Sequence, residues 1–228
     1  MTRKRARIIL GVTAGIFLLA GCSTTRVLAE GEARLAENKV VFEGQQKGRL
    51  YTGGSLQPYI KQKPNSAFLG MESPLLYVYN WQNGGGGAWD RFCQKVGQAP
   101  VIYDESLLDD SAKSMEDHLE YEGWYNSRVE PVPRVKKKIA KVEYDVTLGK
   151  RFPIADIEYR IRDTALASLL AADSAHFTIH RGDPLSEASL EKESERIAQH
   201  FRDNGYWGFS KNYFFFYADT STVRDTAD

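Results

Sequence analysis

The chain has 228 residues, of which 42% are hydrophobic, and its 30 basic residues are balanced by 30 acidic ones. This hydrophobic content supplies a packed core and excludes a wholly disordered chain. The zero net charge excludes a general nucleic-acid binder, which would carry a basic excess.

The first 21 residues are predicted to be a signal peptide. Basic residues gather in residues 1–7, and residues 8–20 are uncharged and mostly apolar. That run is shorter than the about 20 residues needed to cross a bilayer, and its order is typical of a secretory signal. It ends in Leu19-Ala20-Gly21-Cys22, which resembles the lipobox of bacterial lipoproteins. An ordinary secretory signal followed by a chance cysteine is the alternative.

The lipobox resemblance implies that Cys22 carries covalent lipid, the only non-protein group that we expect. Several acyl chains make a stable anchor, because each buried CH₂ contributes about 0.8 kcal/mol. Removal of residues 1–21 leaves 26 basic and 30 acidic residues, a net charge of −4. Ser23 stands where Asp would be the usual inner-membrane retention signal, so we expect the outer membrane, with the folded part facing the periplasm. Residues 22–33 would form the lipidated tether.

A first unit is expected over residues 34–149, with a first strand at Lys39–Glu43 and a first helix near Ser55–Ile60. It carries an insertion at about residues 61–98. The glycine run Gly84–Gly87 in this insertion lacks the Lys-Ser/Thr of a phosphate loop, so we expect a flexible linker. A short helical stripe follows, made of Trp89, Phe92, Cys93 and Val96.

The aromatic residues of the insertion leave two interpretations open. Tyr79, Trp81 and Trp89 could pack against the unit's own sheet. They could also touch a membrane surface or a partner, because such side chains favour half-wet interfaces.

The strongest signal is a repeat at an offset of 82 residues. In each copy, residues recur at +4, +3 and +4, which is typical of a helix with one apolar face. The first copy reads Leu108, Ala112, Met115 and Leu119, and the second reads Leu190, Ser194, Ile197 and Phe201. We therefore expect two long helices that occupy equivalent places in two related units.

The residues that flank these helices repeat at the same offset. Asp104 and Ser186 are suitable N-caps, because their side-chain oxygens accept from free N–H groups. Gly123 and Gly205 stand where a helix ends in the left-handed conformation. An aromatic pair follows each glycine, Trp124-Tyr125 in one copy and Tyr206-Trp207 in the other.

Each long helix is followed by residues typical of strands. In the first unit, Val129–Val135 precedes a turn at Lys136–Lys138. The next residues alternate, with Ala140, Val142, Tyr144, Val146 and Leu148 on one face. Such alternation indicates a half-buried strand.

The second unit is expected over residues 150–228. The alternation of Ile157, Tyr159 and Ile161 predicts its first strand, Ala165–Ala172 a short helix and Tyr213–Tyr217 a later strand. The tail Asp219–Asp228 is polar, so we expect the second unit to be truncated before its last strand, in a fragment of a longer protein.

The order of strand, short helix, longer helix, strand and strand resembles the POTRA domains of the BamA/TamA superfamily. Some segments are similar to one branch, the TamL-like lipoproteins of the Bacteroidota: Gly21–Thr25, Tyr59–Asn65, Phe68–Gly70 and Pro100–Asp104. The resemblance implies an α+β fold of two POTRA-like modules, each with a small mixed sheet and helices on one face.

No catalytic constellation stands out, and we do not expect an enzyme. His176 and His180 lie in strand-like residues, where their rings would be about 13 Å apart, so no metal site is expected. Cys93 lies on an apolar stripe and is predicted to be a small core residue. Asp109-Asp110 complements the dipole of a helix start.

The POTRA resemblance implies that the second strand of a unit lies at the edge of its sheet and receives extended polypeptide as an added strand. In the first unit, Pro131 and Pro133 would blunt this edge if their missing N–H groups face outward. We therefore expect the receptive edge in the second unit: Lys211, Asn212, Tyr213, Phe214, Phe215, Phe216 and Tyr217. The alternative is that Tyr213–Tyr217 packs under its own helices.

Together these features predict a lipid-anchored, periplasmic, polypeptide-binding region of an outer-membrane protein assembly or translocation factor. Its expected partners are unfolded outer-membrane or translocating polypeptides, the membrane that holds its anchor, and an envelope partner such as a TamB-like protein, with no nucleic acid. A stand-alone lipoprotein scaffold is the first alternative, and a periplasmic lipoprotein enzyme is the second.

Overall fold

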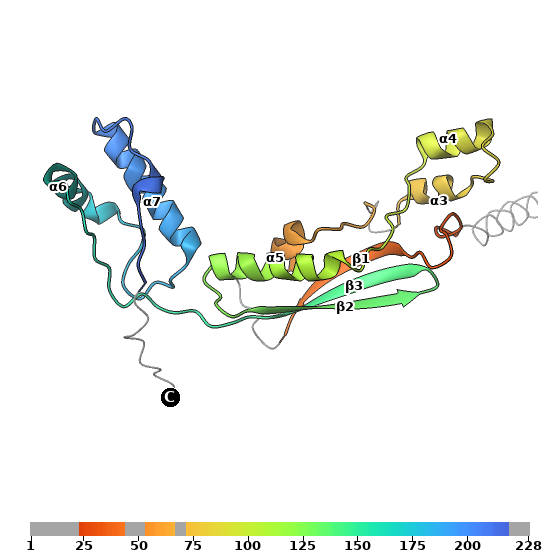
Figure 1. The fold of residues 1–228 in the computed structure, drawn as a ribbon, viewed down its shortest axis with the longest axis horizontal. Coiled ribbons are helices and arrows are strands. Elements are labelled where there is room, and N and C mark those ends of the chain that lie inside the picture. The colour runs from red at the N-terminus through yellow and green to blue at the C-terminus, as the bar shows by residue number, and fades with distance from the viewer. Residues whose placement is uncertain (1–22, 44–52, 67–71, 219–228) are drawn as a thin grey trace, which may run out of the picture. The chain divides into compact units, whose positions relative to one another are not determined.

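A computed structural model describes residues 23–43, 53–66 and 72–218 of the chain (Figure 1). Its contacts divide the chain into two compact units. The first unit holds Met1–Glu116 and Arg128–Thr147, and the second holds Asp117–Ser127 and Leu148–Asp228. The predicted signal peptide, Cys22 and the polar tail Asp219–Asp228 lie outside the described residues.

The first unit has an α+β architecture, which confirms the predicted fold class. Its elements are β1 (Arg34–Phe42), α2 (Gly53–Leu56), a 3-10 turn η1 (Gln57–Tyr59), α3 (Pro74–Asn80), α4 (Ala88–Val96), α5 (Leu107–Tyr121), β2 (Arg128–Lys136) and β3 (Ile139–Thr147). The last turns of α5 belong to the second unit. The first strand begins five residues earlier than the sequence predicts, because its start pairs with the turn before β3.

The three strands form one mixed sheet in the order β1-β3-β2. β3 lies in the centre, parallel to β1 and antiparallel to β2. A two-residue turn joins β2 to β3, and its Lys137 and Lys138 have φ angles of 51° and 61°. Both central residues of a type I′ hairpin turn need such positive angles.

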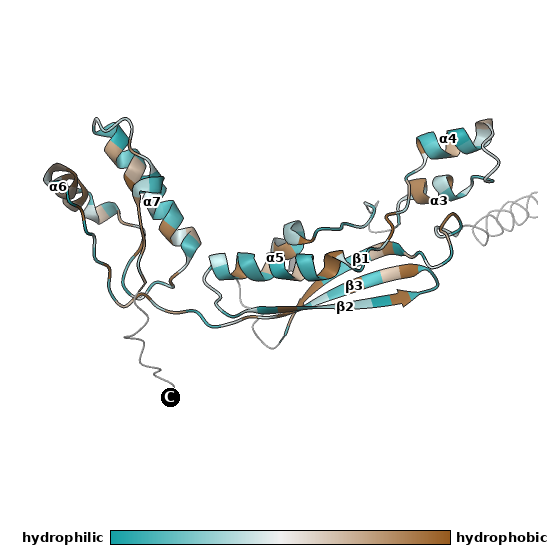
Figure 2. Cartoon of the chain, viewed as in Figure 1, coloured by the Kyte–Doolittle hydropathy of each residue, from teal (hydrophilic) through white to brown (hydrophobic). Residues whose placement is uncertain are grey.

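One face of the sheet is the core face. The alternating residues of β3 are buried as predicted: Ala140, Val142, Tyr144 and Val146. The first turns of α5 lie over this face (Figure 1) and bury their own apolar side. Figure 2 shows hydrophobic and hydrophilic residues alternating along these elements.

The other face of the sheet is polar. Lys141 pairs with Glu37 across 2.7 Å, and Lys39 lies 3.5 Å from Glu143. These pairs join β1 to β3, and all four side chains are partly or largely exposed. Exposed pairs contribute roughly 0–1 kcal/mol each, so the stability of the sheet comes from its core face.

The second unit contains α6 (Thr164–Ala172), the 3-10 turns η2 (Ser174–His176) and η3 (Lys211–Tyr213), and the long helix α7 (Glu187–Asp203). Its core consists of Leu170, Ile197 and Phe201, with other apolar side chains packed around them. Ser186 caps α7 by accepting from the Ser189 N–H, as predicted.

The repeat extends to the backbone hydrogen bonds at the ends of the two long helices. Gly123 and Gly205 have φ angles of 88° and 99°. The Trp124 N–H donates to the Leu119 carbonyl (2.8 Å), and the Tyr206 N–H donates to the Phe201 carbonyl (3.0 Å). The two bonds are related by the same 82-residue offset, and each closes a Schellman-type helix end.

The prediction of two strands in the second unit is wrong, because its described residues form no strand. Residues 154–161 form no strand, and Tyr213–Tyr217 consists of the end of η3 and an irregular segment. The sheet of the first unit gives the physical reason, because its outer strands pair only with central β3. The 82-residue offset places the counterpart of β3 from residue 221 onward, outside the described residues. A strand without a neighbour has no backbone partner that would hold it extended.

Candidate functional site

Backbone hydrogen bonds show which groups of β2 face the outside of the sheet. The Val146 carbonyl accepts from the Glu43 N–H (2.9 Å), so Val146 turns its backbone groups toward β1. Successive residues alternate, and Asp145 and Glu143 therefore turn theirs toward β2. They stand opposite Glu130 and Val132. The backbone groups of the alternate residues of β2, Val129, Pro131, Pro133 and Val135, therefore face away from the sheet.

The outer side of β2 is almost without hydrogen-bond donors. Pro131 and Pro133 carry no N–H, as the blunted-edge interpretation requires. The outward N–H of Val129 is already bound to the Glu116 carboxylate at 2.9 Å. Among the described residues of this edge, only the Val135 N–H is left without a partner. An added strand pairs with hydrogen-bond donors and acceptors in alternation. The edge of β2 lacks most of these donors and is therefore poorly suited to pair with an extended polypeptide.

The outer side of β1 is covered over its first half. The Leu35 N–H donates to the Val101 carbonyl (2.8 Å), and the Tyr103 N–H donates to the Ala33 carbonyl (2.7 Å). Further along, the Asn38 carbonyl accepts from the Gln57 side chain (3.2 Å). The chain itself therefore occupies this stretch of the edge.

The predicted edge of the second unit, Lys211–Tyr217, divides into a held part and a free part. Lys211 forms an ion pair with Glu191, and the Ser210 hydroxyl accepts from the Asn212 N–H (3.3 Å) to cap η3. Phe214 packs on the core of the unit, with its ring 5.8 Å from that of Phe209. This contact agrees with the alternative that the segment packs under its helices.

The remaining aromatic side chains of this segment face solvent. Tyr213 is 63% exposed, Phe215 78%, Phe216 52% and Tyr217 94%. Trp207 in the preceding loop is 83% exposed. Aromatic rings are costly to leave in water, and a group of exposed rings close together in the sequence is typical of an interaction surface.

A buried charge network lies elsewhere in the second unit, and sequence reasoning missed it. Arg196 of α7 forms ion pairs with Asp173 (2.5 Å) and Glu193 (2.8 Å), which are both buried. Glu193 also accepts from the N–H of Thr178 (3.1 Å), and Asp173 accepts from His176 (2.8 Å). The i,i+3 spacing of Glu193 and Arg196 was visible, but the approach of Asp173 depends on tertiary folding.

Partners within the unit lower the pKa of both buried carboxyl groups in this network. The Arg196 guanidinium, helped by His176, holds the pKa of Asp173 below its usual range. Burial alone would raise the pKa of Glu193, but hydrogen bonds from Arg196 and Thr178 bring it below its usual value. Both carboxylates are thus fixed as anions by partners within the unit. Because each is saturated by those partners, neither is poised as an acid or a base.

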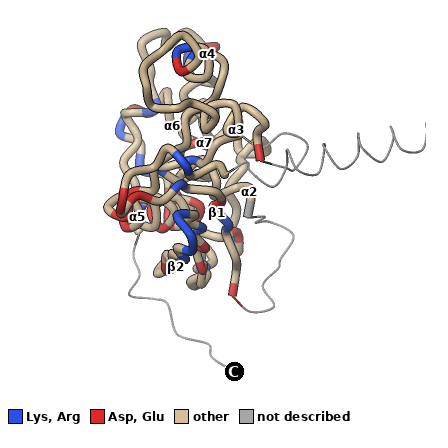
Figure 3. The backbone as a smooth tube through the Cα atoms, turned by 90° about the vertical axis from the view of Figure 1, so that its right-hand side faces the viewer, with Lys and Arg blue, Asp and Glu red and all other residues tan. Residues whose placement is uncertain are grey.

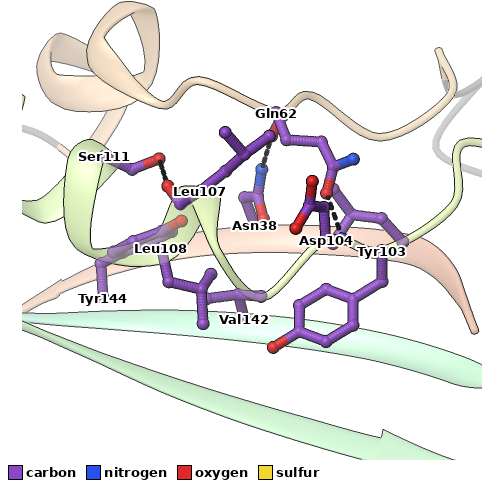
Figure 4. A pocket seen from close by; sticks show the side chains of 10 residues that line it. Asn38, Gln62, Tyr103, Asp104, Leu107, Leu108, Ser111, Val142 and Tyr144 are labelled. Atoms are coloured by element: carbon purple, nitrogen blue, oxygen red, sulfur yellow. Dashed lines mark hydrogen bonds between the residues drawn. The ribbon is translucent and has the colours of Figure 1, made fainter.

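A narrow niche lies between α5 and the sheet of the first unit (Figure 4). Its walls include Leu35, Asn38, Gln62, Tyr103 and Tyr144. The Asn38 side chain donates to the Gln62 carbonyl (2.6 Å), and the Gln62 side chain accepts from the Asp104 N–H (3.1 Å). The space between these groups is too small to admit a water molecule.

The remaining predictions about individual residues were tested in part. Cys93 is a fully buried free thiol, which confirms it as a core residue. Gly84–Gly87 is not a loose linker, because the Asp90 carboxylate accepts from Asn83 N–H (2.6 Å) and Gly86 N–H (2.8 Å). Within the described ranges, no group of three His, Cys, Asp or Glu side chains could hold a metal ion. No helix there is long and apolar enough to cross a membrane.

No protein-family model and no curated protein matches this chain. Among solved structures, the crystal structure of Haemophilus influenzae BamA POTRA3-5 is similar to it, with a TM-score of 0.27 and 14% sequence identity. The match covers 79% of this chain and 89% of that chain. That structure belongs to the class that the order of elements resembles, but a TM-score this low carries no argument. The closer likeness to the TamL branch stays a prediction.

Proposed function

We propose that this chain is the lipid-anchored, periplasmic, polypeptide-binding region of an outer-membrane protein assembly or translocation factor. Clients would be unfolded outer-membrane or translocating polypeptides, and Cys22 would carry the lipid. The observation that carries the proposal is the contrast between two equivalent segments. The 82-residue offset relates β2 to residues 210–218, yet β2 is a closed edge, whereas residues 214–218 form no strand and expose the rings of Phe215, Phe216 and Tyr217.

Segment 214–218 offers what an unfolded client needs. Phe214 has the backbone angles of an extended residue (φ −86°, ψ 135°), and the segment takes part in no strand of the described chain. An extended client could pair with this backbone with little regard to sequence, while Phe215 and Tyr217 cover its apolar residues. Binding of this kind requires no catalytic group.

Site-specific photo-crosslinking tests this assignment. A photoreactive phenylalanine analogue at Tyr217 reports on the second unit, and the same analogue at Val135, which is 55% exposed, reports on β2. The probe is an outer-membrane protein diluted from urea. We expect several-fold more adduct from position 217, and no adduct once the client has folded. Equal or stronger capture at position 135 would overturn the assignment.

The anchor is tested separately. The Cys22→Ser variant should lose labelling by radioactive palmitate and should move from the outer-membrane fraction to the soluble periplasm. Cys93→Ser is the matched control, because its thiol is buried in α4. Labelling that survives Cys22→Ser would contradict lipid attachment at this residue without bearing on client binding.

A further inference from the structure

The two helices of the insertion in the first unit expose an apolar surface. On α4, Trp89 and Phe92 are each 50% exposed, and Val96 is 44% exposed. These residues follow i, i+3 and i+7 spacing, which places them on one side of the helix. Leu75 in α3 is 45% exposed, and Trp81, which follows the last residue of α3, is 46% exposed. The name "aromatic hairpin face" is used below for these five side chains.

The large apolar side chains of α4 face solvent, whereas those of the apolar stripe of α5 are buried. A helix on a protein core normally buries its apolar stripe. In α4, however, the buried positions are Asp90 and Cys93, while the large apolar residues face solvent. The interpretation that Trp81 and Trp89 pack against the sheet is therefore wrong for much of their surface.

The aromatic hairpin face is held in shape. The rings of Trp89 and Phe92 stack at 5.6 Å, and the Trp89 indole N–H donates to the Trp81 carbonyl (3.2 Å). Gly97 lies so close to the backbone of Tyr79 that a Cβ would be 2.5 Å from its nitrogen. Asp90 binds the glycine run that joins the helices. The exposed rings are thus presented by an ordered hairpin.

The exposed charged residues of α4 are basic, and Glu72, which precedes α3, is paired with Arg34. Between residues 73 and 100 the charged residues are Asp90, Arg91 and Lys95. Asp90 is buried, and the N–H of Asn83, together with N–H groups of the glycine run, lowers the pKa of its carboxyl. Arg91 and Lys95 are exposed. Figure 3 shows both basic and acidic positions at α4, and the acidic one, Asp90, is buried.

The hairpin is tied to the first described residues of the chain. The Val27 N–H donates to the Asn80 side chain (3.2 Å), and the Thr24 hydroxyl donates to Glu72 (3.5 Å). Glu72 also forms an ion pair with Arg34 at the start of β1. Thr24 is only two residues after Cys22, at most about 7 Å along an extended chain. An acyl anchor at Cys22 would therefore hold the hairpin close to its membrane.

We propose that the aromatic hairpin face docks on the surface of an anionic lipid bilayer. The indole and phenyl rings would enter the interface between headgroups and acyl chains, and Arg91 and Lys95 would contact the anionic headgroups. Its position beside the membrane rests on the acylation of Cys22 proposed above. The face itself is independent of the client-binding segment.

The four tryptophans of the chain make a direct test possible. In the acylated chain, the variant Trp124→Phe/Trp207→Phe keeps only the hairpin tryptophans, and Trp81→Phe/Trp89→Phe keeps only those of the second unit. Each variant is reconstituted in anionic phospholipid vesicles with brominated acyl chains, which quench nearby indoles. We expect at least twofold stronger quenching for the hairpin pair. Its quenching should fall in Arg91→Gln/Lys95→Gln and in neutral vesicles.

Equal quenching of the two pairs, or none for the hairpin pair in vesicles that carry the protein, would overturn the proposal. A blue shift of the hairpin tryptophans that depends on protein concentration without lipid would also overturn it, because a second copy would then cover the face. Flotation with neutral vesicles reports on the acyl anchor alone. Failure of the anchor is therefore distinguishable from failure of the docking surface.

Discussion

At the scale of single residues, two prolines decide what the edge of the first sheet can do. Pro131 and Pro133 stand opposite Tyr144 and Val142 without exchanging hydrogen bonds with them, so the sheet loses nothing by their presence. The outer edge loses two donors, and Glu116 occupies a third. Edge strands commonly carry proline for protection against unwanted pairing.

The prolines can be tested by restoring the donors. In Pro131→Thr/Pro133→Thr, two N–H groups return to the outside of β2, and threonine suits a strand. We expect concentration-dependent association of the chain and a severalfold rise in client crosslinking at position 135. Arg134→Thr is the matched control, since its N–H faces β3. If both variants behave alike, the prolines do not protect this edge.

Arg196 carries a second prediction at this scale. Arg196→Met leaves Asp173 and Glu193 buried without their cation. We expect the free energy of unfolding of the second unit to fall by about 3 kcal/mol. Hydrogen exchange of α7 amides measures the loss. Lys192→Met on the exposed side of α7 is the control and should change stability by less than about 0.5 kcal/mol.

The same network sets a pH dependence. The folded-state pKa values of Asp173 and Glu193 are lowered, so their stabilisation is complete above their unfolded values of about 4. It is lost as pH falls through the lower folded values. Protection of α7 should therefore decrease with acid in the native chain and much less in Arg196→Met. An equal acid dependence in both would show that other groups are responsible.

At the scale of elements, the two helix ends form a natural comparison. A Cβ on Gly205 would meet no atom within 4 Å, whereas one on Gly123 would lie 2.4 Å from the Leu185 carbonyl oxygen. Gly205→Ala should lower the free energy of unfolding by about 1–2 kcal/mol, because alanine is strained in the left-handed conformation. Gly123→Ala should cost clearly more because backbone must also move. Urea denaturation of both variants checks the order, and equal losses would contradict it.

The helices were predictable from the sequence because their signals are local. The apolar spacing, the Ser186 cap and the two glycines lie within a few residues of the bonds that they make. The strands of the second unit were not predictable in this way. Ile157–Ile161 alternates well, but a strand also needs a neighbour that is remote in sequence.

The features of the candidate sites also differ in whether local sequence could predict them. The proline side of β2 follows from the two-residue period of a strand. Cys93 is buried as predicted, but the other three residues of its predicted stripe are exposed. The exposure of Trp89 and the ion pair between Arg34 and Glu72 could not be predicted, because both depend on how the insertion meets the rest of the first unit.

At the scale of the whole molecule, the chain repeats one plan with two different outcomes. The first unit completes its sheet and closes the edge of β2. The second unit keeps the long helix and its Schellman end but leaves the counterpart of β2 unpaired within the described residues. We infer that the first unit serves as a support beside the membrane and the second as the place where client polypeptide binds.

Hydrogen exchange of backbone amides, with and without an outer-membrane protein diluted from urea, tests this central claim most directly. Strand addition to the second unit predicts that the amides of residues 214–218 become protected when client is present. Those of β2 should exchange as before. Protection confined to β2, or no protection in residues 214–218 under conditions where the client is bound, would contradict the account.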